Sequence, residues 1–122
     1  MSTAMEVFRE PHDGPAILRV TGSVDATSAG DFEQRVGQLL ELDTDRQVLM
    51  DCGALEYVSS SGLRVLMVLL KKLTARRGAL ALCGLQEPVR NVFEISGLDL
   101  IFTIRKTRED ALAALGGLPP AR

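Results

Sequence analysis

Aromatic residues, cysteine and histidine are all scarce in this chain of 122 residues. Aromatic side chains make up 4% of the sequence and tryptophan is absent, so we expect a core of Leu, Val, Ile and Ala. The two cysteines, Cys52 and Cys83, have the spacing of neither a zinc site nor a redox pair, and buried side chains are the better interpretation. The single histidine, His12, falls in a predicted hairpin turn, where we expect it to be exposed.

Neither a secretory leader nor a membrane span is expected. The first six residues lack a basic start and an apolar core. The longest strongly apolar run, residues 65–70, lies between Arg64 and Lys71 and is far shorter than a membrane-spanning helix. Together with the two cysteines, these absences predict a protein of the reducing cytoplasm.

A strongly basic region is also lacking, and the formal net charge is −2. The densest basic cluster lies at the end of a predicted helix, where positive charge complements the negative helix terminus. Aromatic side chains that stack on bases are not interleaved with it. We therefore expect no nucleic-acid binding from this cluster, which consists of Lys71, Lys72, Arg76 and Arg77.

What the chain does have is the composition of one folded domain, with 46% hydrophobic and 25% charged residues. Apolar periodicity predicts the order β-β-α-β-α-β-α-β-α, which indicates an α/β fold with a mixed sheet and helices packed on it. We expect a single domain over residues 1–122 with its core at about 5–115. The predicted strands are residues 5–10, 16–21, 47–52, 79–83 and 100–104.

Helix ends are predicted from capping residues. Ser28 with Asp31 three positions later has the pattern of a weak capping box. The acidic run at residues 43–45 is expected to end this first helix. Gly78 follows the second helix where a C-terminal cap belongs. Pro88 suits the first turn of a third helix, and Thr107 is expected to cap a fourth.

We expect no enzyme. The sequence contains no P-loop and no dinucleotide-binding glycine motif after a strand, and potential metal ligands are not clustered. A Ser-His-acid triad would require His12 to reach the serines near Ser60. The segment around Ser60 also lacks the glycine that precedes the serine of a nucleophile elbow.

Three consecutive serines, residues 59–61, followed by Gly62, open the second predicted helix. One serine is expected there as an N-cap, and three are more than a cap requires. A helix N-terminus offers free N–H groups and partial positive charge, so it tolerates a phosphoryl group. A purely structural interpretation and a phosphorylation site both remain open from the residues alone.

Several segments, taken together, resemble the STAS-domain anti-sigma factor antagonists. The run YVSSSGLRVL at residues 57–66 is similar to the family signature, and TGSVD at 21–25 matches its loop motif. Further matches lie at residues 48–52, 84–89 and 93–98. The resemblance covers nearly the whole chain.

This resemblance implies a function by partner exchange. Family members bind an anti-sigma factor, which is a serine protein kinase of the histidine-kinase-like ATPase fold, and so release a sigma factor. The kinase inactivates the antagonist by phosphorylating one serine, and a PP2C-type phosphatase reverses this. Carried over by position, the modified serine is Ser60. The implied partner-binding residues are Ser23, Asp25, Thr27, Ser59, Ser61, Gly62 and Arg64.

One departure is that Ser59 stands where many family members have Asp. Other branches of the family also carry Ser there. The alternative interpretation is a STAS interaction module of another complex, such as a lipid-transport or sensor assembly, without a phosphorylation switch. A serine hydrolase that uses Ser60 is a more distant alternative.

Overall fold

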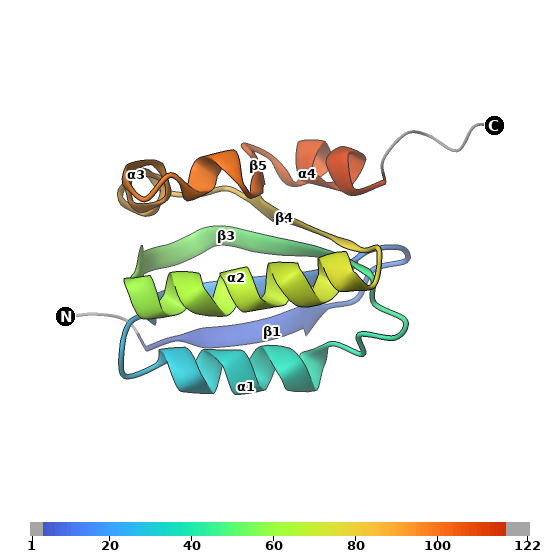
Figure 1. Cartoon of the computed structure of the whole chain (residues 1–122), viewed down its shortest axis with the longest axis horizontal. Helices are drawn as coiled ribbons and strands as arrows, with labels where there is room; N and C mark the ends of the chain where they lie inside the picture. The colour runs from blue at the N-terminus through green and yellow to red at the C-terminus, as the bar shows by residue number, and fades with distance from the viewer. Residues whose placement is uncertain (1–3, 117–122) are drawn as a thin grey trace.

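The computed structural model describes residues 4–116 and shows an α/β fold (Figure 1). The predicted order of elements is confirmed, with one short 3₁₀ helix added before the last strand. The strands are β1 (Glu6–Glu10), β2 (Ala16–Val24), β3 (Gln47–Val58), β4 (Ala79–Cys83) and β5 (Thr103–Arg105). The helices are α1 (Ala29–Leu39), α2 (Ser60–Ala75), α3 (Glu87–Ile95), η1 (Leu98–Leu100) and α4 (Arg108–Leu115).

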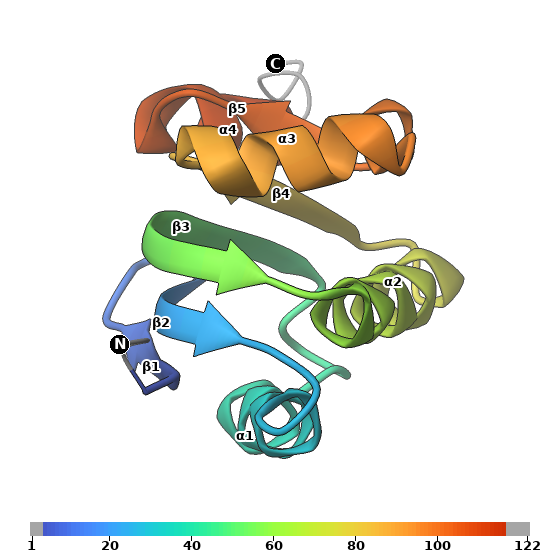
Figure 2. The same cartoon turned by 90° about the vertical axis from the view of Figure 1, so that its left-hand side faces the viewer.

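The five strands form one mixed sheet in the order β1-β2-β3-β4-β5. A hairpin makes β1 antiparallel to β2, whereas β2, β3, β4 and β5 are parallel. Parallel strands need crossover connections, which the helices α1, α2 and α3 supply. Figure 2 shows the strands stacked in sequence order, with the ends of β2 and β3 directed toward the viewer. The mixed α/β sheet expected from the sequence is therefore confirmed.

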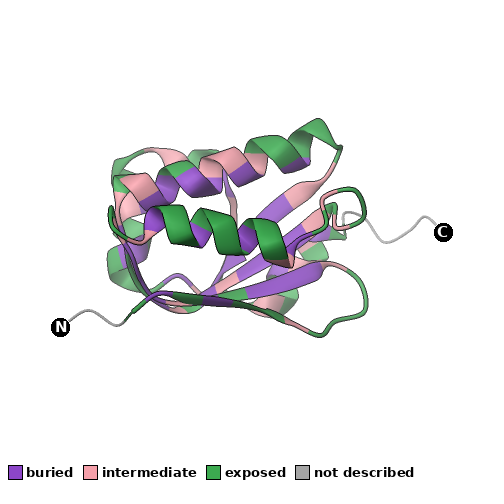
Figure 3. Ribbon diagram, turned by 90° about the horizontal axis from the view of Figure 1, so that it is seen from below, coloured by how far each residue is buried: buried purple, intermediate pink, exposed green. Residues whose placement is uncertain are grey.

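Helices α1 and α2 lie side by side on one face of the sheet (Figures 1 and 2). Apolar side chains at helical spacing, such as Phe32 and Val36 of α1 and Leu66 and Leu73 of α2, are buried against it. Central strand residues are buried as well, while the outer surfaces of the helices are largely exposed (Figure 3). This layer contains the main hydrophobic core.

A smaller core lies on the opposite face, under α4. Here Ala111 and Leu115 of α4 cover Ile17, Leu49 and Cys83 of the central strands. Both cysteines are buried and free, as the sequence predicted. Burial raises the pKa of both thiols, that of Cys83 to about 11, so neither is a ready nucleophile.

Strands β2 and β3 are longer than the sequence predicted. Gly22 was expected to end the second strand, but β2 continues through it to Val24. Gly22 adopts a φ of 82°, and the register between β2 and β3 shifts at Arg19/Thr21 and Gly22/Ser23. Glycine tolerates this left-handed conformation, so the irregularity bends the pair without ending it. As a result β3 runs to Val58, directly before the serine cluster.

Gly78 takes part in the C-terminal cap of α2, as predicted, but it is not the residue in the left-handed conformation. Arg77, not Gly78, takes the left-handed conformation with φ 60°. The N–H of Gly78 donates to the carbonyl oxygen of Leu73 at 2.7 Å and that of Arg77 to Thr74 at 3.0 Å, which is a Schellman motif. A Cβ on Gly78 would lie 2.0 Å from the carbonyl oxygen of Arg46. This glycine is therefore needed for close backbone approach.

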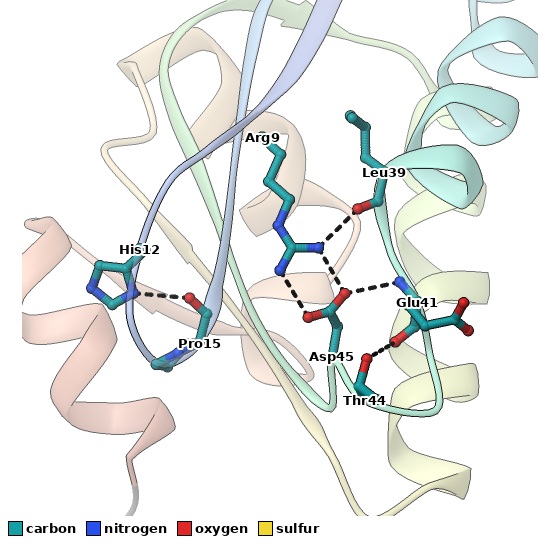
Figure 4. A network of polar contacts seen from close by, with 7 residues as sticks. All are labelled: Arg9, His12, Pro15, Leu39, Glu41, Thr44 and Asp45. Atoms are coloured by element: carbon teal, nitrogen blue, oxygen red, sulfur yellow. Dashed lines mark hydrogen bonds and ion pairs between the residues drawn. The ribbon is translucent and has the colours of Figure 1, made fainter.

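The first helix ends earlier than the sequence predicted, at Leu39. Asp45 folds the following loop back, because its carboxylate accepts the N–H of Glu41 at 2.8 Å (Figure 4). Two nitrogens of Arg9 donate to the same carboxylate at 2.7 and 2.8 Å, and Arg9 also donates to the carbonyl oxygen of Leu39. His12 is exposed in the β1–β2 turn, as predicted.

The last strand was predicted at residues 100–104, and this was wrong for its first three residues. Gly97, with φ 78°, ends α3, and residues 98–100 form η1 instead of a strand. The strand β5 begins only at Thr103. Apolar run length alone favoured a strand here, although Leu100 and Ile101 prove to be exposed.

Candidate functional site

The candidate site consists of two neighbouring chain segments at the carboxyl ends of β2 and β3. Val24 pairs with Val58 at the end of the parallel ladder, so the loop after β2 and the start of α2 lie side by side. The N–H of Ser59 donates to the carbonyl oxygen of Val24 at 2.8 Å and ties the two segments together. Figure 2 shows both at the end of the molecule that faces the viewer. Ligands of open α/β sheets commonly bind at such strand ends.

Asp25 organises the loop between β2 and α1. Its Oδ1 accepts the N–H of Thr27 at 2.9 Å, the hydroxyl of Thr27 at 2.7 Å and the N–H of Ser28 at 3.1 Å. The hydrogen bonds from Thr27 hold the pKa of Asp25 below its usual range. A charged side chain that forms this many local bonds fixes the loop and keeps negative charge at the site.

Ser28 forms hydrogen bonds within this loop, and the capping box predicted for Ser28 and Asp31 is not formed. Its hydroxyl oxygen accepts the N–H of Asp25 at 2.9 Å and lies 3.1 Å from the carbonyl oxygen of Ser23. The side chain makes no capping hydrogen bond to α1, and Asp31 pairs with Arg35 at 3.2 Å instead. An open hollow of about 440 Å³ lies beside the loop, with Asp25, Thr27 and Asp31 among its lining residues.

The three serines of the cluster differ in position and exposure. Ser59 is the N-cap of α2, and its hydroxyl oxygen accepts the N–H of Gly62 at 3.3 Å. Ser60 is the first helical residue and is exposed, whereas Ser61 is half-buried. Aspartate caps helices as well as serine does, so an aspartate at position 59 could fill the same capping role.

The residues predicted from the sequence for partner binding, together with the predicted phosphorylation site Ser60, fall into two groups. Asp25, Thr27, Ser59, Ser60, Ser61 and Arg64 are exposed or partly exposed around the junction. Ser23 and Gly62 are buried, so they shape the site and offer no surface of their own. Gly62 packs under the junction, where a Cβ would lie only 2.7 Å from Cγ2 of Val58.

One residue near the site was overlooked in the sequence. Tyr57 precedes the serine cluster at the end of β3, and 49% of its surface is exposed. Exposed tyrosine is common at the energetic centre of protein interfaces. Tyr57 opens the run at residues 57–66 that resembles the family signature, which was a signal for it, but the predicted strand ended at residue 52. Extending β3 brings Tyr57 beside Ser23 on β2.

The electrostatics of the α2 N-terminus suit an added anion. Each of the other three α-helices in residues 4–116 has an acidic side chain in its first turn, and α2 has none. Its positive end is therefore not already neutralised by its own sequence. A phosphoryl group on the exposed Ser60 would lie at this end, next to the Asp25 loop.

Across residues 4–116, no group of three or more His, Cys, Asp or Glu side chains is placed to hold a metal ion. Within the same part of the chain, no helix combines the length and apolar character needed to cross a membrane.

Comparison with known proteins identifies the family. The STAS domain family matches residues 8–111, and the chain belongs to this family. Relatives carry names that assign them as anti-sigma factor antagonists.

BtrV of Bordetella bronchiseptica, provisionally assigned as an anti-sigma factor antagonist, is 38% identical to this chain. The alignment covers 90% of this chain and 94% of BtrV. The anti-sigma-F factor antagonist RsfB of Mycobacterium tuberculosis is 28% identical over 87% of this chain and 85% of its own. The crystal structure of an anti-sigma factor antagonist from Mycobacterium paratuberculosis superposes with a TM-score of 0.81. It is 28% identical and covers 92% of this chain and 94% of its own.

Proposed function

We propose that this chain is an anti-sigma factor antagonist that works by exchange of protein partners. Unmodified, it binds an anti-sigma factor, a serine protein kinase of the histidine-kinase-like ATPase fold, and thereby releases a sigma factor. Phosphorylation of Ser60 ends this binding, and a PP2C-type phosphatase restores it. The names of the relatives support the antagonist class, and the free buried cysteines fit the reducing cytoplasm.

The observation that carries the proposal is the exposed Ser60 at the start of α2, tied to the Asp25 loop through the bond between Ser59 and Val24. Ser59 is engaged as the N-cap and Ser61 is half-buried, so Ser60 is the most exposed residue of the three. The docking face would combine Tyr57, the Asp25 loop, Ser60 and Arg64. Tyr57, an exposed aromatic residue, would supply the apolar contact that such faces need.

The switch follows from charge. Phosphorylation adds roughly 1.5 to 2 negative charges at Ser60. The α2 N-terminus can accept them, so the domain itself should remain folded. Negative charge brought against acidic groups across an interface can cost several kcal/mol, and each ~1.4 kcal/mol is tenfold in affinity. A loss of about a hundredfold or more is therefore expected on phosphorylation.

Intact mass spectrometry tests the modified residue. The chain is incubated with ATP and a serine kinase of the stated fold from the same genome, alongside the variants Ser60→Ala and Ser61→Ala. We expect one added phosphoryl group on the wild type and on Ser61→Ala, and none on Ser60→Ala. Addition to Ser60→Ala would refute the assignment of Ser60.

A binding measurement tests the switch itself. Ser60→Asp should bind the same kinase about a hundredfold more weakly than the wild type, because it places a negative charge on the docking face. Ser60→Ala should bind as tightly as the wild type and serves as the control for loss of the hydroxyl. Equal affinity of all three proteins for the kinase would refute the proposed switch.

A further inference from the structure

A cluster of exposed aliphatic side chains lies on the turn between α3 and β5, on elements that the proposed function does not use. Ile95, the last residue of α3, is 88% exposed, Leu100 is 87% exposed and Ile101 is 53% exposed. Single exposed apolar residues are ordinary, but three within seven positions concentrate apolar surface on one turn, and concentrated exposed apolar surface marks interaction sites. We call these three residues the aliphatic patch.

The turn that carries the patch is fixed on both sides. Gly97 ends α3 in the left-handed conformation, and the N–H of Phe102 donates to the carbonyl oxygen of Leu98 at 3.0 Å. Phe102 is buried and meets Phe93 edge to face, with ring centroids 5.5 Å apart. Leu98 packs against the same core.

With Leu98 and Phe102 directed into the core, the residues between them are held outward. The ordering of this turn is therefore completed on folding and adds no cost when a partner binds. The exposure of Leu100 and Ile101 follows from this anchored geometry.

The charges beside the patch restrict the partner. Glu94 precedes Ile95 and Asp99 precedes Leu100, and both carboxylates are exposed without an ion pair among residues 4–116. Arg90, the one basic residue of α3, donates to the carbonyl oxygen of Leu85 at the start of the helix. The patch thus has an acidic border, which favours a partner with basic residues next to its apolar ones.

The acidic border also argues against two other occupants. An anionic membrane surface attracts basic, not acidic, protein surfaces. A second copy bound about a twofold axis would place Glu94 and Asp99 of one chain against the same residues of the other, and like charges repel.

We propose that the aliphatic patch docks an amphipathic helix of another protein, with an aliphatic stripe flanked by lysine or arginine. The patch would bind the apolar face of the helix, and the acidic border would favour helices with positive charge beside that face. In Figures 1 and 2, α3 lies at the same end of the molecule as the start of α2, so this partner would approach from the side of the candidate site.

The test uses the full chain and two synthetic helical peptides of about five turns, which share one leucine stripe. One peptide has lysine and the other glutamate beside the stripe. NMR with labelled methyl groups should show the lysine peptide shifting the signals of Ile95, Leu100 and Ile101, and binding about tenfold more tightly than the glutamate peptide. The absence of shifts at these methyl groups, or an equal affinity for both peptides, would overturn the proposal.

Variants separate the patch from general attraction between the lysine peptide and an acidic protein. Ile95→Gln/Leu100→Gln should weaken binding about tenfold, whereas Phe8→Gln, an exposed apolar control on β1, should leave it unchanged. Glu94→Lys/Asp99→Lys should reverse the preference in favour of the glutamate peptide. Unchanged ring-proton signals of Phe93 and Phe102, recorded beside the methyl signals, establish that each variant is folded.

Two further measurements test whether a second copy of the chain or a membrane binds the patch instead. Concentration-dependent dimerisation that Ile95→Gln/Leu100→Gln abolishes would assign the patch to a second copy. Binding to vesicles of phosphatidylcholine and phosphatidylglycerol would assign it to a membrane. Either outcome overturns the proposal, and because no kinase is present, neither bears on Ser60.

Discussion

Gly62 of α2 lies so close to Val24 of β2 that a Cβ on the glycine would sit 2.8 Å from Cγ1 of the valine. The same Cβ would lie 2.7 Å from Cγ2 of Val58 and 3.2 Å from the carbonyl oxygen of Val24. The start of α2 can therefore approach the ends of β2 and β3 only because residue 62 has no side chain. The absence of a side chain at residue 62 thus allows the start of α2 to lie against the loop that follows β2.

We expect Gly62→Ala to lower the free energy of unfolding by about 1–3 kcal/mol, because overpacking shifts a helix against two buried valines. Gly37→Ala is the matched control, since a Cβ there meets no atom within 4 Å on the exposed side of α1. It should be neutral or stabilise by up to about 1 kcal/mol through helix propensity. Urea unfolding of both variants measures the difference, and equal effects would contradict this account of Gly62.

The cap and the proposed modification site should respond differently to removal of a hydroxyl group. Ser59→Ala should destabilise the chain by about 1 kcal/mol, because it removes the acceptor for the N–H of Gly62. Ser59→Asp should restore this stability, since aspartate is an equally good cap. Ser60→Ala should change stability by less than about 0.5 kcal/mol, because the residue is exposed. Chemical unfolding of the three variants tests the assignment, and a larger effect at residue 60 than at 59 would reverse it.

Asp25 is expected to order its loop through hydrogen bonding. Asp25→Ala removes the acceptor of the bonds from Thr27 and Ser28, so the amide protons of these two residues should exchange with solvent about tenfold faster or more. Asp25→Asn keeps a carbonyl oxygen in the same place and should preserve most of the protection. Hydrogen exchange followed by NMR measures this, and unchanged protection in Asp25→Ala would show that the loop does not depend on the carboxylate.

Arg108 of α4 joins three parts of the fold. It donates to Asp51 of β3 at 2.6 Å and to Glu10 of β1 at 2.7 and 3.3 Å. Burial alone would raise the pKa of Asp51, but the hydrogen bonds from Arg108 and from the N–H of Gly53 outweigh burial and lower it. The hydrogen bond from Arg108 likewise lowers the pKa of Glu10.

Both carboxyl groups therefore stabilise the fold at pH values above their unfolded pKa of about 4, and this contribution is lost as the pH falls through the lower folded values. Arg108→Met should cost about 1–2 kcal/mol at neutral pH, because the cluster is only partly screened by solvent. The difference from the wild type should shrink below about pH 3. Unfolding curves across this range test it, with the exposed Arg105→Met as control. A difference that did not vary with pH would show that Arg108 acts by packing alone.

Most of the architecture could be predicted from the sequence because helices and strands here carry strong periodic patterns. The order of elements, the burial of both cysteines and the exposure of His12 all followed from such local signals. The extra length of β2 and β3 could not, because Gly22 usually ends a strand and only the pairing with β3 carries the chain through it. Similarly, Leu100 and Ile101 satisfy a strand pattern locally, yet the anchoring of Leu98 and Phe102 turns them outward.

The candidate site was predictable in its location but not in its internal division of roles. Residues 59–61 are chemically identical in the sequence, and only the geometry distinguishes the cap from the exposed Ser60. Ser23 was expected at a partner surface because the family resemblance of the segment at residues 21–25 implied it. The longer β2 places it in the sheet, where it is buried. The phosphorylation of Ser60 remains a prediction.

The sheet order β1-β2-β3-β4-β5 also affects how the protein is made. Each strand pairs with the strand before it along the chain, so the sheet can lengthen by one strand at a time as the polypeptide leaves the ribosome, without waiting for a distant segment. Growth stops at β5, which has three residues and gives another polypeptide little backbone to pair with. The last strand of the sheet therefore forms an edge that resists aggregation.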